Sequence, residues 1–224
     1  MGVVAEAFAW LSDGANWSGT GGIPNRLFEH VRISLATVLA AAAIAIPAGL
    51  AIGHTGKGRF LVVSLSNVGR AIPSFAILGL ALPVAIKLNL GLGFWPTFIA
   101  LFALALPPIL TNTYVGVAGV DRDLVEAARG MGMAETEILR RLEVRLAAPV
   151  IMVGLRTASV EVVATATLAA IVAGGGLGRF IIDGFAVRDD ARILGGAILV
   201  AVLAIFTELF LGGVERLARP RTSS

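Results

Sequence analysis

The sequence predicts an all-α, polytopic membrane protein that crosses the bilayer about five times. Of its 224 residues, 57% are hydrophobic and only 15% are charged, whereas soluble domains are about 45–50% apolar and about a quarter charged. The mean hydropathy is +0.87. Uncharged runs cover residues 33–53 and 88–120, and each exceeds the roughly 18 apolar residues that predict a membrane-spanning helix.

The expected spans belong to one membrane domain that covers residues 1–224. They are 31–53, 60–86, 95–118, 148–173 and 192–214. The segment 1–30 is expected on the outer side. It begins with a short interfacial helix over 1–11, in which Phe8 and Trp10 lie at the lipid–water boundary, and continues as a loop over 12–22. Prolines within the spans predict either hinges or fixed bends.

The distribution of basic residues predicts the orientation, because cytoplasmic loops carry an excess of Lys and Arg. With the N-terminus outside, the cytoplasmic segments hold ten: Lys57, Arg59, Arg122, Arg129, Arg140, Arg141, Arg145, Arg216, Arg219 and Arg221. The outer segments then hold six: Arg26, Arg32, Lys87, Arg179, Arg188 and Arg192. We therefore expect the N-terminus outside and the C-terminus in the cytoplasm. The net charge of +3 reflects these flanking arginines and does not indicate nucleic-acid binding.

Several classes of catalytic and metal site lack the residues they require. The chain has no cysteine, which excludes disulfides and thiolate chemistry. Residues 53–58 contain a Gly-Lys pair but not the spacing of a phosphate-binding loop. His30 and His54 lack further ligands at metal-site spacing and are expected at membrane interfaces, and the glutamates of 121–149 are expected in solvent. We expect no enzyme, no cofactor and no metal site.

Residues 121–149 form a charged, amphipathic island between apolar spans. Asp121 or Asp123 can cap a helix, and Leu124, Ala127, Ala128 and Met131 recur at helical spacing on one face. Gly130 and Gly132 predict its end. Glu126 is expected to pair with Arg129 or with a basic partner. From these residues alone, the island is either a docking helix or an ordinary cytoplasmic loop.

Polar residues inside the expected spans are the candidates for a transport pathway or an intramembrane ion pair. Thr157, Glu161 and Thr165 recur every four residues in the fourth span, and Arg70 lies in the second. Glu161 either lines a passage for a cationic or zwitterionic solute or pairs with Arg70 or Arg156. Arg156 and Glu208 are expected near cytoplasmic ends, where long side chains reach the interface.

Residues 120–144, VDRDLVEAARGMGMAETEILRRLEV, resemble the EAA loop of permease subunits of ATP-binding-cassette (ABC) importers for osmoprotectants such as glycine betaine, choline, carnitine and proline betaine. Residues 149–184 resemble the fourth span and the Gly-rich outer loop of that family, and 71–74 and 107–114 also fit. The resemblance covers about 28–215. One departure is Arg145, which stands where the broad motif has proline. Without that ring, the second helix of the island is expected to run straighter into the fourth span.

The resemblance implies a type I importer permease with a MetI-like fold in a bacterial plasma membrane. It assigns ATPase coupling to Glu126, Ala127, Ala128, Arg129, Gly130, Met131 and Gly132. It assigns an outer gate or binding-protein contact to Gly174, Gly175, Gly176, Leu177 and Gly178, which otherwise predict only a flexible connector. The implied partners are a second permease subunit, identical or related, two ABC ATPase subunits that hydrolyse ATP, an extracytoplasmic substrate-binding protein and membrane lipid.

Three other functions stay open at this point. One is an ABC permease for a different small solute, such as an amino acid. Another is a self-sufficient secondary transporter or channel, although the expected internal repeat is not evident. The third, an intramembrane enzyme, would need a nucleophile–base pair or metal cluster that the spans do not clearly offer.

Overall fold

The structure of the protein, a computed structural model, describes residues 2–218, without the side chains of residues 68, 70, 217 and 218. Every regular element in this range is helical, so the all-α prediction is confirmed. The α-helices are α1 (Val3–Ser12), α2 (Ile23–Thr55), α3 (Arg59–Ala71), α4 (Ser74–Lys87), α5 (Phe94–Ala118), α6 (Arg122–Gly130), α7 (Glu135–Glu137), α8 (Val144–Thr165), α9 (Gly178–Val187) and α10 (Asp190–Ala218). Short 3₁₀ segments cover Gly14–Trp17 and Ala166–Val172, and a π-helical segment covers Ile138–Glu143.

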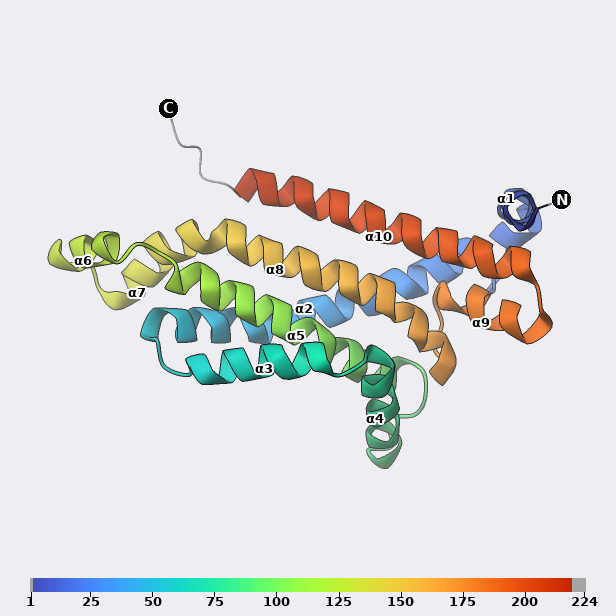
Figure 1. Cartoon of the computed structure of the whole chain (residues 1–224), viewed down its shortest axis with the longest axis horizontal. Helices are drawn as coiled ribbons and strands as arrows, with labels where there is room; N and C mark the ends of the chain where they lie inside the picture. The colour runs from blue at the N-terminus through green and yellow to red at the C-terminus, as the bar shows by residue number, and fades with distance from the viewer. Residues whose placement is uncertain (1, 219–224) are drawn as a thin grey trace.

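Four continuous helical stretches of the described chain are long and apolar enough to cross a membrane: Ile23–Thr55, Phe94–Ala118, Glu135–Val172 and Asp190–Arg216. They run along the long axis of the molecule (Figure 1). α5 packs against both α2 and α8, and α10 packs on α8. α1 and α9 lie at one end of this bundle, whereas α6 and the end of α10 lie at the other (Figure 1).

Small residues bring α2 and α5 close together. Ala41, Ala45, Gly49 and Gly53 recur every fourth residue on one face of α2, and both alanines are at most 1% exposed. A Cβ at Gly49 would lie 2.6 Å from the Cβ of Thr113 on α5, so nothing larger than hydrogen fits there. Because lipid tails are as apolar as the helices, this van der Waals packing rather than the hydrophobic effect holds membrane helices together.

The single helix predicted over 60–86 is instead two helices. α3 ends at Ala71, α4 begins at Ser74, and α4 stands across the bundle rather than along it (Figure 1). Pro73 explains the break, since it has no N–H for the helical ladder and disfavours helical backbone at the residue before it. Its ψ of 135° is that of extended chain. Together α3 and α4 still return the chain from the α6 end to the start of α5.

The fourth span and the segment before it form one nearly continuous helical stretch, Glu135–Val172. The π-helical segment Ile138–Glu143 joins α7 directly to α8, so Arg145 lies in an unbroken helix. Pro149, the second residue of the predicted span 148–173, lies inside α8. The missing proline at position 145 therefore lets the amphipathic segment run straight into the span.

The N-terminal helix forms as predicted but is anchored to the bundle. α1 packs on α10, and the Trp10 ring meets the Phe180 ring edge-on at 5.2 Å between centroids. Phe8 is exposed, as expected of an interfacial residue, whereas Trp10 is half-buried. The end of the molecule that carries α1 and α9 is thus packed through an aromatic contact.

Candidate coupling segment and transport pathway

α6 protrudes from one end of the bundle as a short capped helix (Figure 1). The Asp121 carboxylate accepts a 2.9 Å hydrogen bond from the backbone N–H of Asp123, so Asp121 is the N-cap. The helix ends at Gly130, and Gly132 has φ +87°, a conformation that glycine adopts without steric cost. The predicted start and stop of this helix are therefore present.

Most of the α6 surface faces solvent. Leu124 is 48% and Met131 is 77% exposed, whereas Ala128 is only 4% exposed. Glu126 and Ala127 are also exposed. Apolar side chains on a protruding helix give a surface that fits a groove in another protein.

The turn after α6 is closed by a two-point ion pair. Nε of Arg129 donates to Oε1 of Glu135 at 2.6 Å, and Nη2 donates to Oε2 at 3.1 Å. The hydrogen bond to Glu135 raises the pKa of Arg129 above its already high ordinary value. Among the described contacts Arg129 makes no ion pair with Glu126, so the expected pairing within α6 is replaced by one across the turn.

The same glutamate reaches the last turn of α2. Nε2 of His54 lies 3.4 Å from Oε2 of Glu135, and Nδ1 of His54 lies 2.6 Å from Oε2 of Glu143. The Glu143 side chain is only 7% exposed, so the prediction that the glutamates of this island are solvated is wrong for Glu143. Arg129, Glu135, His54 and Glu143, here called the brace, tie the segment 121–149 to the end of α2.

A cavity of about 360 Å³ with a mixed polar and apolar lining, here called the polar cavity, lies between α3, α5 and α8. It reaches the surface of the bundle, because Thr157 and Glu161 are exposed. Its polar lining comes from Thr157 and Glu161 on α8 and from Thr111 and Asn112 on α5. Pro107 and Pro108, which also line it, have no N–H, so the carbonyls of 103 and 104 lose their helical donors beside the cavity. The structure therefore brings the predicted residues Thr157 and Glu161 together with Thr111 and Asn112, which the sequence analysis did not name as site residues.

The other two predicted residues of this group, Thr165 and Arg70, are not among the residues that line the polar cavity. Thr165 lines a separate, much smaller gap with Ser74 and Thr97. The side chain of Arg70 lies outside the described part of the structure, so its expected pairing with Glu161 is not placed. The predicted polar stripe on α8 thus opens onto two spaces rather than one.

Arg156 faces away from this cavity, toward α10. Its Nη1 lies 3.3 Å from Oε1 of Glu208 and 3.3 Å from Oε2 of Glu215. The Glu215 side chain is only 6% exposed. Arg156 therefore links α8 to α10, and its ion pairs among the described contacts are with Glu208 and Glu215.

The Gly-rich loop is held down on α2 at the end opposite α6. Oε2 of Glu29 accepts a 2.8 Å hydrogen bond from the backbone N–H of Gly176. Nδ1 of His30 accepts from the N–H of Leu177 at 3.3 Å, so Nε2 carries the proton and donates to the carbonyl of Val163 at 2.8 Å. His30 is fully buried, which corrects its expected place at the interface. These contacts are here called the clasp.

The clasp requires glycine for lack of space. A Cβ at Gly174 would lie 2.5 Å from the carbonyl oxygen of Ala169, and one at Gly178 would overlap that of Thr167. A Cβ at Gly175 would overlap the Glu29 carboxylate. The predicted flexible connector is therefore a tightly fitted loop.

Sequence reasoning missed the residues that hold these two sites together. For Glu29 the sequence offers one signal, its spacing of one helical turn from Arg26 and from Arg32. In the structure Glu29 pairs with Arg26 at 2.8 Å. His54 and Glu143 gave no comparable signal, since they are 89 residues apart. Among the described residues there is no group of three or more His, Asp or Glu side chains that could hold a metal ion.

Comparisons with known proteins agree with this architecture. The chain is 38% identical over 195 residues to the choline transport system permease protein OpuBB of Bacillus subtilis, covering 87% of this chain and 88% of the relative. It is 41% identical over 194 residues to the carnitine transport permease protein OpuCB of Listeria monocytogenes, covering 87% of each. The inward-facing MetNI methionine ABC transporter matches with a TM-score of 0.76 at 19% identity, covering 86% of this chain and 94% of that one.

The likeness to MetNI confirms the MetI-like fold, with α6 between the spans α5 and α8. Residues 41–223 match the family described as "Binding-protein-dependent transport system inner membrane component". This match spans most of the chain, and the curated relatives extend it toward the N-terminus. The chain belongs to the binding-protein-dependent transport system inner membrane component family.

Proposed function

We propose that this chain is the permease subunit of an ATP-driven importer for osmoprotectant quaternary amines, such as choline, glycine betaine, carnitine and proline betaine. The single observation that carries the ATP-driven part is the protruding, exposed α6 held by the brace. The solute class rests on the relatives, which are named for transport of choline and carnitine. ATP would be hydrolysed on two partner ATPase subunits, and a second permease subunit would complete the passage.

The orientation we propose puts α6 and the end of α10 in the cytoplasm and α1 and α9 outside. The excess of basic residues in the segments at the α6 end supports it, as does the need for an ATP-hydrolysing partner to reach α6. The Gly-rich loop then faces the side from which an extracytoplasmic binding protein delivers solute. An outer gate in a bacterial plasma membrane is expected on this outer side, where the Gly-rich loop lies.

α2 would connect the two ends mechanically. Its last turn carries His54 of the brace, and its second turn carries Glu29 and His30 of the clasp. At 1.5 Å per residue these contacts are about 37 Å apart along one helix. A displacement of α6 by the ATPase would therefore reach the outer loop through a rigid element, as in rigid-body switching.

The polar cavity is the proposed intramembrane part of the passage. Glu161 supplies a carboxylate, and Thr111, Asn112 and Thr157 supply hydroxyl and amide groups. Groups of this kind suit a cationic solute that carries a polar end. Because the cavity lies beside α3 and α5, motion of those helices would change its access.

Uptake by the reconstituted complex tests the proposal. The permease, its cognate ATPase and its binding protein are placed in proteoliposomes, and uptake of choline, glycine betaine, carnitine and methionine is measured with ATP. We expect uptake of at least one quaternary amine and none of methionine. Uptake of methionine alone would overturn the solute class and leave the ATP-driven permease in place.

A further inference from the structure

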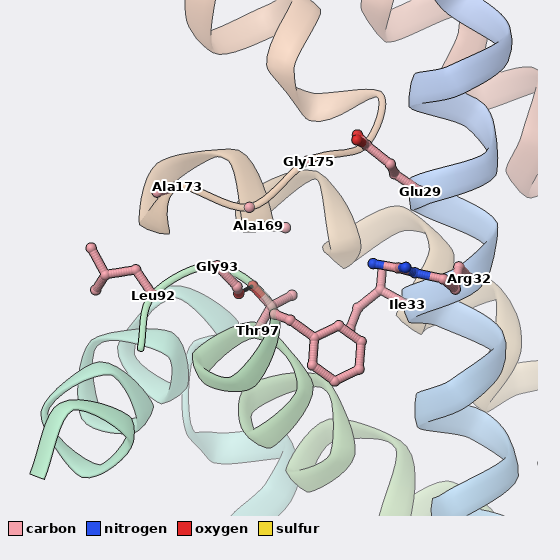
Figure 2. Close-up of a pocket in the computed structure, with 11 residues that line it drawn as sticks. Glu29, Arg32, Ile33, Leu92, Gly93, Thr97, Ala169, Ala173 and Gly175 are labelled. Atoms are coloured by element: carbon pink, nitrogen blue, oxygen red, sulfur yellow. Dashed lines mark hydrogen bonds between the residues drawn. The ribbon is translucent and has the colours of Figure 1, made fainter. Parts of the chain in front are cut away.

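A second, smaller pocket lies beside the clasp. It has a volume of about 190 Å³ and is formed where α2, the connection between α4 and α5, and the Gly-rich loop meet (Figure 2). Sites for drug-sized ligands occupy about 300–1,000 Å³, so this one suits a smaller solute. It is separate from the polar cavity, since none of the lining residues are shared.

The acidic group of this pocket is already satisfied. Oε2 of Glu29 accepts hydrogen bonds from Nη1 of Arg26 at 2.8 Å and from the N–H of Gly176 at 2.8 Å. The Glu29 carboxylate points toward the loop at Gly175 (Figure 2). Its charge is therefore balanced mainly by the ion pair with Arg26, with a further electrostatic contribution from Arg32.

The basic group is different. Arg32 lies one turn after Glu29, and its side chain extends into the same pocket (Figure 2). Among the described residues it makes no hydrogen bond and no ion pair within 4 Å. Its exposed guanidinium therefore leaves its N–H donors open, and that planar fork matches the two oxygens of a carboxylate.

An aromatic ring completes the pocket. The Arg32 guanidinium carbon lies 5.9 Å from the centroid of the Phe94 ring, and Phe94 is supported by Phe98 at 5.8 Å and by Trp95 at 5.3 Å between centroids. The ring thus holds the guanidinium by a cation–π contact. This contact keeps a carboxylate-binding group in place at the pocket.

We propose that this pocket is a receiving site for zwitterionic quaternary amines, in which Arg32, held by Phe94, binds the solute carboxylate. The proposal rests on the import of quaternary amines argued above. It adds a selection step on the permease itself, because glycine betaine and carnitine carry a carboxylate whereas choline carries only a hydroxyl group. Arg32 then favours carboxylated solutes over choline.

The test compares Arg32→Gln and Arg32→Lys with the wild type in the complete complex with ATPase and binding protein. Initial uptake of glycine betaine and choline is measured at subsaturating concentrations. Loss of a charge-assisted hydrogen bond predicts that Arg32→Gln lowers the betaine-to-choline ratio about tenfold, with partial recovery in Arg32→Lys. The binding protein is the same in every sample, so its own preference cancels. Arg188→Gln, which removes an exposed charge at the same end of the molecule, should leave the ratio unchanged.

Two results overturn this inference while the proposed function stands: equal losses of betaine and choline uptake in Arg32→Gln, or an unchanged ratio. Equal losses would mean that Arg32 only supports the structure. A wild-type complex that imports neither solute would instead refute the proposed solute class, and the receiving site with it.

Discussion

The Glu29 carboxylate on α2 accepts a 2.8 Å hydrogen bond from the backbone N–H of Gly176, 147 residues further along the chain. The neighbouring His30 binds the same loop and also the carbonyl of Val163 on α8. One turn of α2 therefore fixes both the Gly-rich loop and the helix that leads into it. This arrangement makes the loop a fixed part of the helical bundle rather than a loose connector.

The fit of this loop predicts a strong effect of Gly178→Ala. The added methyl group would overlap the backbone carbonyl of Thr167, which cannot rotate away, and overpacking of this kind costs about 1–3 kcal/mol. We expect a lower midpoint of thermal unfolding for the purified permease in detergent. Gly79→Ala is the matched control, since no atom lies within 4 Å of the added Cβ. Equal midpoints for the two variants would contradict the tight fit.

The brace predicts a specific defect for His54→Ala. Without the imidazole, the nearly buried Glu143 loses its partner and Glu135 loses its link to α2. We expect the amount of solute imported per ATP hydrolysed to fall several-fold, because α6 then moves without α2. The measurement is paired uptake and ATPase activity in proteoliposomes. Lys57→Ala removes an exposed side chain just beyond α2 and should keep the wild-type ratio. A normal ratio in His54→Ala would show that the brace does not transmit motion.

The link between α8 and α10 predicts that Arg156→Met destabilises the protein. Removing one partner of a fully buried ion pair costs about 3–5 kcal/mol, and the 29% exposure of the Arg156 side chain lowers that cost here. Without Arg156, the nearly buried Glu215 loses one ion pair and lies close to Glu208. Thermal unfolding of Arg156→Met should therefore occur at lower temperature, and adding Glu215→Gln should recover part of the loss. If the double variant is less stable than Arg156→Met, the pairing does not act as described.

Local signals predicted α1, α2, α5, α6, α8 and α10, but not the division of 60–86 into α3 and α4, nor the helix α9. The bounds of α6 follow from a capping aspartate and two glycines, and the long spans follow from uncharged runs. Ala41, Ala45, Gly49 and Gly53 recur every fourth residue, and such spacing of small residues indicates a face of α2 that packs closely on another helix, which is α5 in the structure. Proline was less informative: Pro47, Pro83 and Pro149 lie inside continuous helices, whereas Pro73 ends one.

The site contacts depended on the three-dimensional packing. His54 meets Glu143 across 89 residues, and Glu29 meets Gly176 across 147, so neither pair has a signature in a single sequence. Arg129 could reach either Glu126 or Glu135, and only the turn made by Gly130 and Gly132 decides for Glu135. The glycines of the outer loop predicted a turn, but their crowding by Ala169, Thr167 and Glu29 could be found only in the fold.

The central claim, that a separate ATPase drives this permease through α6, is tested most directly by the number of solute molecules imported per ATP hydrolysed. Proteoliposomes with permease, ATPase and binding protein are compared with proteoliposomes that lack the ATPase, and Glu126→Arg and Gly132→Leu are compared with the wild type. We predict no uptake without the ATPase, and in both variants ATP hydrolysis with little or no uptake. Uptake by the permease alone, or a wild-type ratio in both variants, would contradict the account.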